Sequence, residues 1–214
     1  MKTLSLLLLL AAAATTAVPK AQAASVTLNS LDLGKSVPMI VDGVAASDPA
    51  YRLNITLDGV SRFAFCVDLF TLINYATYNS NLGTPDMINN GLRVAWLLEN
   101  YGLTAVTNDG ASAVQLAIWD LVHDNGDGFG AGRVQLASSA SSNLTALSNL
   151  YLSNSIGQSS TQATILFNTS LTNGSPAQTL ITSYVPTAAS PEPSTFVLLG
   201  AGVLAIGLGR IRRK

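Results

Sequence analysis

Alternating apolar and polar residues on both sides of the dipeptide Asp58-Gly59 constrain the fold more than any other feature of the sequence. Every second residue from Tyr51 to Leu57 is apolar, and so is every second residue from Phe63 to Leu69. A period of two is typical of strands with one buried face, and Asp-Gly favours a tight hairpin because glycine tolerates a positive φ. The sequence therefore predicts an antiparallel hairpin, with Cys66 on its second strand, on the face opposite Phe65.

Apolar residues then recur at helical spacing. Three segments carry such a stripe: Asp86 to about Gly102, about Ala111 to His123, and Val134 to about Asn154. Shorter apolar runs predict further strands at residues 25–28, 36–41, 163–168 and 179–185. We therefore expect an α+β fold, a β-sandwich or barrel with a helical insert.

The N-terminus has the features of a secretory signal peptide. A basic Met1-Lys2 start precedes an apolar run from Leu4 to Ala14 and the small-residue motif Ala21-Gln22-Ala23. The run is too short for a membrane span, which needs about 20 residues. We expect residues 1–23 to be removed on export, by cleavage after Ala23.

The C-terminus has three parts in a fixed order. A linker at residues 187–194 contains Pro191-Glu192-Pro193, an apolar segment follows at 195–209, and the basic tail occupies 210–214. This order resembles the PEP-CTERM sorting signal of Gram-negative bacteria, which implies recognition and removal by a membrane-embedded exosortase. A basic tail that stays on the cytoplasmic side would leave the predicted domain, residues 24–186, outside. The resemblance implies transient anchoring in the inner membrane, and then a cell-surface or extracellular location.

The charge balance argues against a nucleic-acid partner. Only 11% of the residues are charged and the net charge is −1. Outside the C-terminal tail there is no basic stripe that could follow a phosphate backbone. Uncharged polar residues are what we expect on an exported surface of this kind.

Cys66 is the only cysteine, so no disulfide can form within the chain. A free thiol in an oxidising compartment is a liability unless it is buried or chemically occupied. The segment Phe65-Cys66-Val67 and the helical segment Gln115-Leu116-Ala117-Ile118-Trp119 resemble the paired signature of the thioester domains of bacterial surface proteins. The resemblance implies an internal thioester between Cys66 and Gln115 at the sheet–helix interface, supported by Trp119 and Phe65.

A thioester of this type would give a single-use covalent anchor and not a turnover enzyme. An incoming amine or hydroxyl displaces the sulfur and becomes joined to the glutamine side chain. The partner would be a nucleophile on a surface or matrix polysaccharide or protein, and no cofactor or metal is required. The alternative is a non-covalent structural or matrix-binding envelope protein in which Cys66 is simply a buried thiol.

Two further patterns invite other interpretations. Cys66 with His123, the only histidine, could suggest a cysteine hydrolase, but no hydrolase signature surrounds the cysteine. We expect His123 to be a helix-end residue whose partial positive charge favours the helix dipole. The run from Asp124 to Gly128 resembles a calcium loop, but the EF-hand pattern would place Val134 where glutamate is required. A turn is the better interpretation, so no metal site is predicted there, and any calcium binding would be weak and adventitious.

Overall fold

A closed ring of antiparallel strands forms one half of the domain in the computed structural model, which describes residues 23–71, 74–170 and 172–186. Each strand of the ring pairs with two neighbours, in the order β1–β2–β3–β7–β6–β4 and back to β1. Because the ring is closed, each of its six strands has a neighbour on both sides, although the pairing does not run the full length of every strand. The strands are β1 (Ala23–Val41), β2 (Val44–Leu57), β3 (Val60–Cys66), β4 (Thr77–Gly83), β5 (Val134–Leu136), β6 (Ala163–Ser170) and β7 (Leu180–Ser183).

The hairpin predicted at Asp58-Gly59 joins β2 to β3. Both turn residues have positive φ, 47° and 82°, as a two-residue turn of this type requires. Leu53, Ile55 and Leu57 are buried, as the alternation predicts. Arg52 is also buried, which a two-residue period does not predict. Its guanidinium pairs with Asp32 and donates to main-chain carbonyls that follow the first helix.

β1 is one long strand where the sequence predicted two short ones. Gly34, expected to separate them, instead lies at an irregularity in the ladder between β1 and β2. Its φ is 142°, and a Cβ atom there would lie 2.3 Å from the carbonyl oxygen of Ala50. Only glycine fits so close to the facing strand, so the strand bends here without ending.

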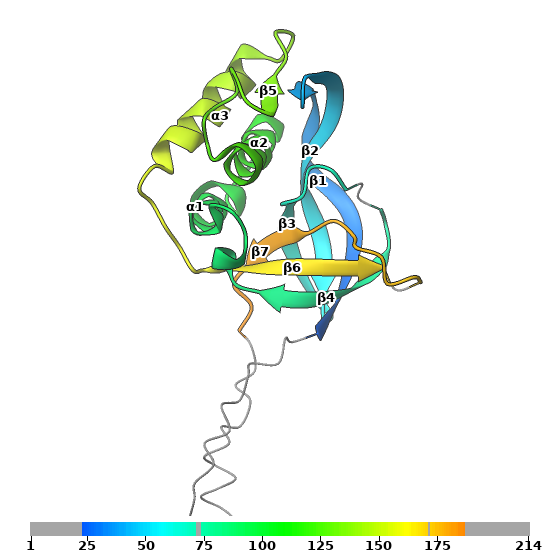
Figure 1. Ribbon diagram of the computed structural model, residues 1–214. Coiled ribbons are helices and arrows are strands. Elements are labelled where there is room, and N and C mark those ends of the chain that lie inside the picture. The colour runs from blue at the N-terminus through cyan, green and yellow to red at the C-terminus, as the bar shows by residue number, and fades with distance from the viewer. Residues whose placement is uncertain (1–22, 72–73, 171, 187–214) are drawn as a thin grey trace, which may run out of the picture. The chain divides into compact units, whose positions relative to one another are not determined.

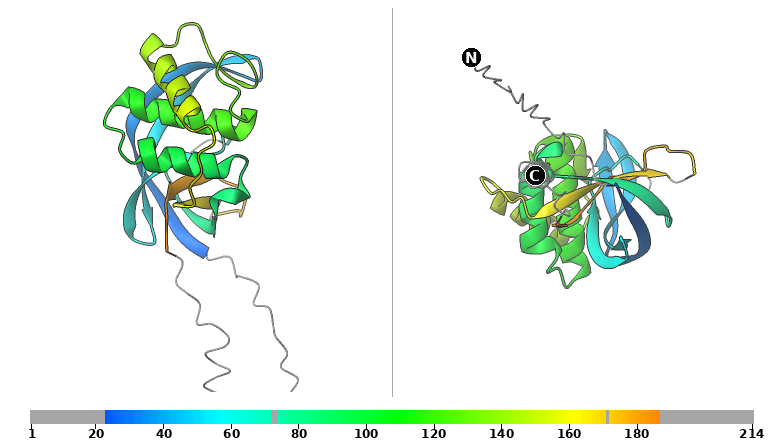
Figure 2. Two further views of the ribbon diagram at one scale, coloured as in Figure 1. Left: turned by 90° about the vertical axis from the view of Figure 1, so that its left-hand side faces the viewer. Right: turned by 90° about the horizontal axis from the view of Figure 1, so that it is seen from below.

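The helical insert lies between β4 and β6 in the chain and covers one side of the barrel (Figures 1 and 2). Its main helices are α1 (Gly91–Leu97), α2 (Asn108–Asp124) and α3 (Ser142–Asn154), with a short 3-10 turn η1 (Pro85–Met87) and a π-helical segment η2 (Leu98–Gly102). This arrangement confirms the predicted α+β class, and the sheet takes the barrel form.

Two helix boundaries differ from the prediction. The segment predicted to begin at Asp86 is divided into η1, α1 and η2, because Asn90 has a positive φ of 52° just before α1. The helix predicted to begin at Val134 begins at Ser142, since residues 134–136 pair with β1 as β5. Ser141 caps that helix by accepting a hydrogen bond from Leu144 N–H. β4 was not predicted, because its alternation is mostly among polar residues.

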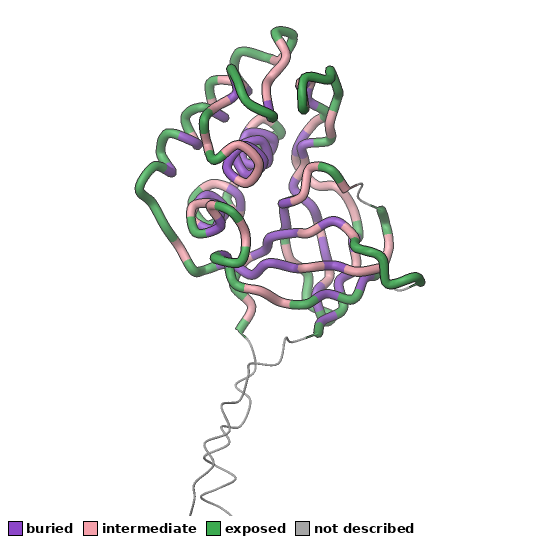
Figure 3. The backbone as a smooth tube through the Cα atoms, viewed as in Figure 1, coloured by how far each residue is buried: buried purple, intermediate pink, exposed green. Residues whose placement is uncertain are grey.

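α2 is the central helix of the insert. It packs on β1 and β2 on one side and on α1 and α3 on the other. Every residue from Gly110 to Leu121 is buried, and Figure 3 shows the helix almost wholly in the buried colour. A helix enclosed on all sides cannot leave its polar residues to water, so each needs a partner inside the protein. Ser112, Gln115 and Asp120 are those residues.

Candidate functional site

Gln115 and Cys66, 49 positions apart, lie side by side in the structure. The main-chain N–H of Cys66 donates to Gln115 Oε1 over 2.9 Å, and Gln115 Nε2 donates to the carbonyl of Cys66 over 2.7 Å. Both residues are buried, with 0% of Gln115 and 4% of Cys66 exposed. Two hydrogen bonds to one residue fix the carboxamide in both position and orientation.

The end of the hairpin explains why Cys66 accepts a side chain as its partner. Pairing between β2 and β3 stops at Leu53 and Ala64, so the ladder position opposite Cys66 has no strand residue. In an antiparallel ladder the inward-directed N–H and C=O groups alternate, and Cys66 has the same phase as Ala64. The Gln115 carboxamide offers one acceptor and one donor, as a strand residue would. It therefore takes the place that β2 leaves free.

The thiol of Cys66 has a different partner, Gln178, which the sequence did not single out. Cys66 Sγ donates to Gln178 Oε1 over 3.1 Å, and Gln178 Nε2 donates to the carbonyl of Asp68 over 2.8 Å. Asn168 in turn holds the main-chain carbonyl of Gln178. Burial, with a smaller contribution from the charge of Asp68, raises the pKa of the Cys66 thiol, so the neutral form is favoured.

The two aromatic residues expected to support the site are both buried. Trp119, one helical turn after Gln115, is 2% exposed, and its indole Nε1 has no hydrogen-bond partner among the described residues. Phe65 is 0% exposed and its ring lies against Gly102 of the helical insert. Phe63, two residues earlier, is more exposed and lies under the guanidinium of Arg52. The helices therefore cover the β3 strand only at its C-terminal end.

His123 lies at the end of α2, but its ring does not contact the thiol through a hydrogen bond. Its Nε2 lies 3.3 Å from Leu69 N and 3.2 Å from Val67 O. Burial lowers the pKa of His123, which favours the neutral ring and opposes the expected contact between a positive charge and the helix dipole. The thiol–imidazole pair on which a cysteine hydrolase depends is not formed between these residues.

Carboxylates gather at the C-terminal end of α2. Asp120, Asp124 and Asp127 each offer an oxygen, and these atoms lie within 4.8 Å of one another. The sequence drew attention to Asp124 and Asp127 but missed Asp120. The available signal was its position one helical turn before Asp124, on the same helix face.

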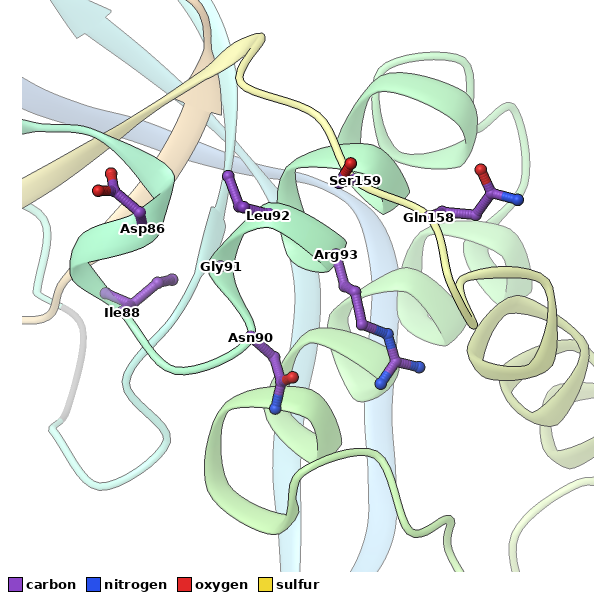
Figure 4. A pocket seen from close by; sticks show the side chains of 8 residues that line it. All are labelled: Asp86, Ile88, Asn90, Gly91, Leu92, Arg93, Gln158 and Ser159. Atoms are coloured by element: carbon purple, nitrogen blue, oxygen red, sulfur yellow. The ribbon is translucent and has the colours of Figure 1, made fainter.

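A separate pocket of 380 Å³ lies between the start of α1 and the chain that follows α3 (Figure 4). Asp86 and Arg93 are its charged lining residues. The Arg93 guanidinium is already bonded to Ser155. None of the residues expected to form the thioester lines this pocket.

Comparison with known proteins identifies the C-terminal segment. Residues 191–214 match the PEP-CTERM protein-sorting motif, which includes the predicted Pro191, Glu192 and Pro193. The motif is that of an exported, cell-surface protein of Gram-negative bacteria and implies processing by an exosortase. Residues 1–22 and 187–214, with the predicted signal peptide, linker, sorting helix 195–209 and tail, lie outside the described residues. No helix in the described part of the chain is long and apolar enough to cross a membrane.

The domain itself has weaker similarities. No curated protein matches the sequence. Among solved structures, the chain is similar to the N-terminal domain of the Streptococcus pyogenes pilus tip adhesin Cpa, with 13% identity and a TM-score of 0.42. That similarity covers 73% of this chain and 100% of the Cpa chain. Similarity at this level does not establish a shared fold or function. The chain thus carries a PEP-CTERM sorting motif on an α+β domain.

Proposed function

We propose that this exported protein forms an internal thioester between Cys66 Sγ and the side-chain carbonyl carbon of Gln115. The thioester would serve for covalent attachment to an amine- or hydroxyl-bearing surface. One observation carries the proposal: the Gln115 carboxamide is fully buried and is held at both of its ends by the main chain of Cys66. A carboxamide so fixed is already adjacent to the residue that supplies the nucleophile.

The contacts fit the chemistry of bond formation. The Cys66 N–H that bonds Oε1 withdraws electron density from the carbonyl and would stabilise the negative charge that develops there on attack. Sγ forms the new bond to the carbonyl carbon, and the bond from that carbon to Nε2 breaks. The thiol proton leaves with the nitrogen as ammonia. Atoms balance without any oxidant or cofactor.

The thiol must exchange partners for this step. Sγ donates to Gln178 Oε1, and rotation about the Cα–Cβ bond of Cys66 would turn it towards Gln115. Gln178 is therefore the residue that holds the thiol away from Gln115 in this conformation, and its carboxamide is the one that the thiol contacts. Burial of the whole pair, with Trp119 one turn away, excludes the water that would hydrolyse the product.

Attack by an external nucleophile then completes the attachment. A primary amine adds to the thioester carbonyl and expels the Cys66 thiol, which leaves an amide on the Gln115 side chain. A hydroxyl would leave an ester in the same way. Each molecule can be joined to one target through this bond, because it presents one Gln115 acyl group. Candidate targets are polysaccharides or proteins of the cell surface or its matrix.

The thiol contact favours a second candidate, a non-covalent structural or matrix-binding envelope protein. The Cys66 thiol has a satisfied hydrogen bond to Gln178, and burial raises its pKa, which protects it from oxidation. In this alternative, Gln115 serves only to complete the ladder at Cys66. Both candidates predict a stable contact between Gln115 and Cys66, so only a chemical test can distinguish them.

Treatment of the native protein with methylamine, followed by peptide mapping, separates the two. The proposal predicts a methylamide on Gln115 and one newly alkylatable thiol. Cys66→Ala is the matched control, because the two hydrogen bonds of Gln115 go to the main chain of residue 66 and do not require the thiol. That variant should not be labelled. A label on Gln178 would show that the acyl partner is misassigned, and an unlabelled wild type would leave the structural alternative.

The sorting segment supports a transient anchor. We infer that residues 195–209 hold the chain in the inner membrane until the exosortase removes the segment beyond the PEP motif. Replacement of Pro191 and Pro193 together should leave the uncleaved precursor in the membrane fraction, as judged by its mass. Normal processing and release of the double variant would refute this inference.

A further inference from the structure

The carboxylate cluster at the end of α2 has no ion-pair partner within the described part of the chain. Its three residues are Asp120, Asp124 and Asp127. Arg93 and Arg133 are close enough to influence the cluster electrostatically, but their guanidinium groups bond elsewhere, Arg93 to Ser155 and Arg133 to Asp42. Three like charges with oxygens within 4.8 Å of one another repel strongly unless a cation lies between them.

The burial of Asp120 distinguishes this cluster from an ordinary group of surface carboxylates. Asp120 is 0% exposed, and its Oδ1 atom is buried without any hydrogen-bond partner among the described residues. Its other oxygen has only a long contact of 3.4 Å with Gly128 N–H. A buried carboxylate with a free oxygen is strongly unfavourable in a folded protein, so an unpaired one at a cluster of acceptors points to a missing positive ligand.

Main-chain N–H groups at the end of the loop that follows α2 hold Asp124 in place. Asp124 Oδ2 accepts hydrogen bonds from Arg133 N–H at 2.7 Å and Val134 N–H at 2.6 Å, which tie the loop's end to the helix. Gly132 lies between the carboxylates: a Cβ atom there would be 2.7 Å from Asp124 Oδ2 and 3.0 Å from Asp127 Oδ2. Its φ of 81° also favours glycine.

We propose that Asp120, Asp124 and Asp127 bind one Ca²⁺ ion. All three donors are carboxylate oxygens, which suits a hard cation better than zinc, whose sites usually include nitrogen or sulfur. The three oxygens lie within 4.8 Å of one another, which is close enough for all three to coordinate one ion. Ca²⁺ fits better than Mg²⁺ because its flexible coordination tolerates a site built partly on an exposed loop. The motif is not an EF-hand, because its first ligand comes from within the helix.

Calcium at this position would connect three elements of the fold. Asp120 and Asp124 belong to α2, Asp127 belongs to the loop, and Asp124 also holds the first residue of β5. β5 pairs with the far end of β1. The ion would therefore fix the C-terminal end of the helix whose middle carries Gln115. External calcium at millimolar concentration is sufficient for a site with the affinity typical of extracellular modules, about 10⁻⁴ to 10⁻³ M.

Titration calorimetry with CaCl₂ on the full-length protein in mild detergent tests the proposal. The expected result is one Ca²⁺ per chain. Asp127→Asn, on the exposed residue, should weaken binding at least tenfold without loss of fold. Asp120→Asn should abolish binding. Asp86→Asn, which neutralises an exposed aspartate outside the cluster, is the matched control and should bind as the wild type does.

Three outcomes would overturn the proposal. The first is the absence of a binding isotherm at calcium concentrations up to 10-fold above the expected dissociation constant of about 10⁻³ M. The second is equal calcium binding by the wild type and Asp127→Asn. The third is a preference for Mg²⁺ over Ca²⁺. Calcium binding does not depend on the thioester. Cys66→Ala should therefore bind calcium as the wild type does, and failure of one proposal leaves the other standing.

Discussion

Gln115 and Asp120 are two buried polar residues on the same helix, and they differ in how the fold treats them. Both are 0% exposed. Gln115 has a partner for its oxygen and for its nitrogen, both on Cys66. Asp120 has one weak contact and one oxygen with none among the described residues. The first residue completes a ladder from within the protein, whereas the second needs a ligand from outside it.

This difference has opposite energetic consequences. Removing a satisfied buried group leaves its partners without hydrogen bonds and destabilises the protein, whereas removing an unsatisfied charge relieves a penalty. Substitutions of Gln115 and of Asp120 should therefore change the stability of the protein in opposite directions.

Gln115→Ala should lower the free energy of unfolding by about 2–6 kcal/mol, because it leaves the buried N–H and C=O of Cys66 without partners, at about 1–3 kcal/mol each. Urea denaturation measures the change. Gln158→Ala, at an exposed glutamine, is the control and should stay within about 0.5 kcal/mol of the wild type. Equal effects of the two substitutions would mean that the Cys66 contact contributes nothing.

Asp120→Asn should act in the opposite direction. In the presence of a calcium chelator at pH 8, it should raise the free energy of unfolding by about 1–3 kcal/mol, the penalty of a buried unsatisfied group. The amide retains the shape of the side chain and removes its charge. Asp86→Asn in the same buffer should change little. If Asp120→Asn destabilises the chelated protein, the carboxylate has a favourable partner that the structure does not show.

The stability of the calcium-free protein should also depend on pH through Asp120. Burial, reinforced by Asp127 and Asp124, raises the pKa of Asp120 from 3.8 to about 7. The folded state therefore binds the Asp120 proton more tightly than the unfolded state does. The stabilisation from this proton is complete below pH 3.8 and is lost as the pH rises through about 7. Relative to Asp120→Asn, the wild type should lose stability between pH 4 and pH 7. Parallel curves for the two proteins would contradict the raised pKa.

Gln178→Leu should have a smaller effect on stability than Gln115→Ala, about 1–3 kcal/mol, because it removes two hydrogen bonds of about 0.5–1.5 kcal/mol each, one to the thiol and one to the carbonyl of Asp68. The two main-chain bonds of Gln115 remain. Its chemical effect should be larger: the thiol is released from the contact that holds it away from Gln115, so the yield of thioester at Gln115 should rise while the fold is kept. An unchanged yield of methylamine adduct would assign Gln178 a structural role only.

The hairpin and the central helix could be predicted because their signals are local. Asp58-Gly59 specifies its own turn, and the apolar spacing from Ala111 to His123 identifies most of α2. Even so, the alternation did not predict which residues of β3 the helices would cover. It places Phe65 on the face opposite Cys66, but the Phe65 ring also lies against the helical insert. A strand that passes under a helical layer is buried on both faces, and alternation alone cannot show this.

The remaining parts of both sites depend on contacts distant in the sequence. Gln178 reaches the thiol across 112 positions, and nothing near residue 178 distinguishes it from other glutamines. Asp120 lies within a nearly continuous apolar run, where its burial follows only from the packing of α1, α3 and the barrel around α2. β5 was missed for the same reason, since its pairing with β1 decides its structure.

The most direct test of the central claim is the intact mass of freshly folded, exported protein under non-reducing conditions. If the thioester forms, the wild type should be lighter than the mass of its processed sequence by one ammonia. Cys66→Ala, which keeps the hydrogen bonds of Gln115 to the main chain, should have its full sequence mass. A wild type at full sequence mass, with a thiol that becomes titratable only on unfolding, would contradict the account and leave Gln115 as a structural partner of Cys66 alone.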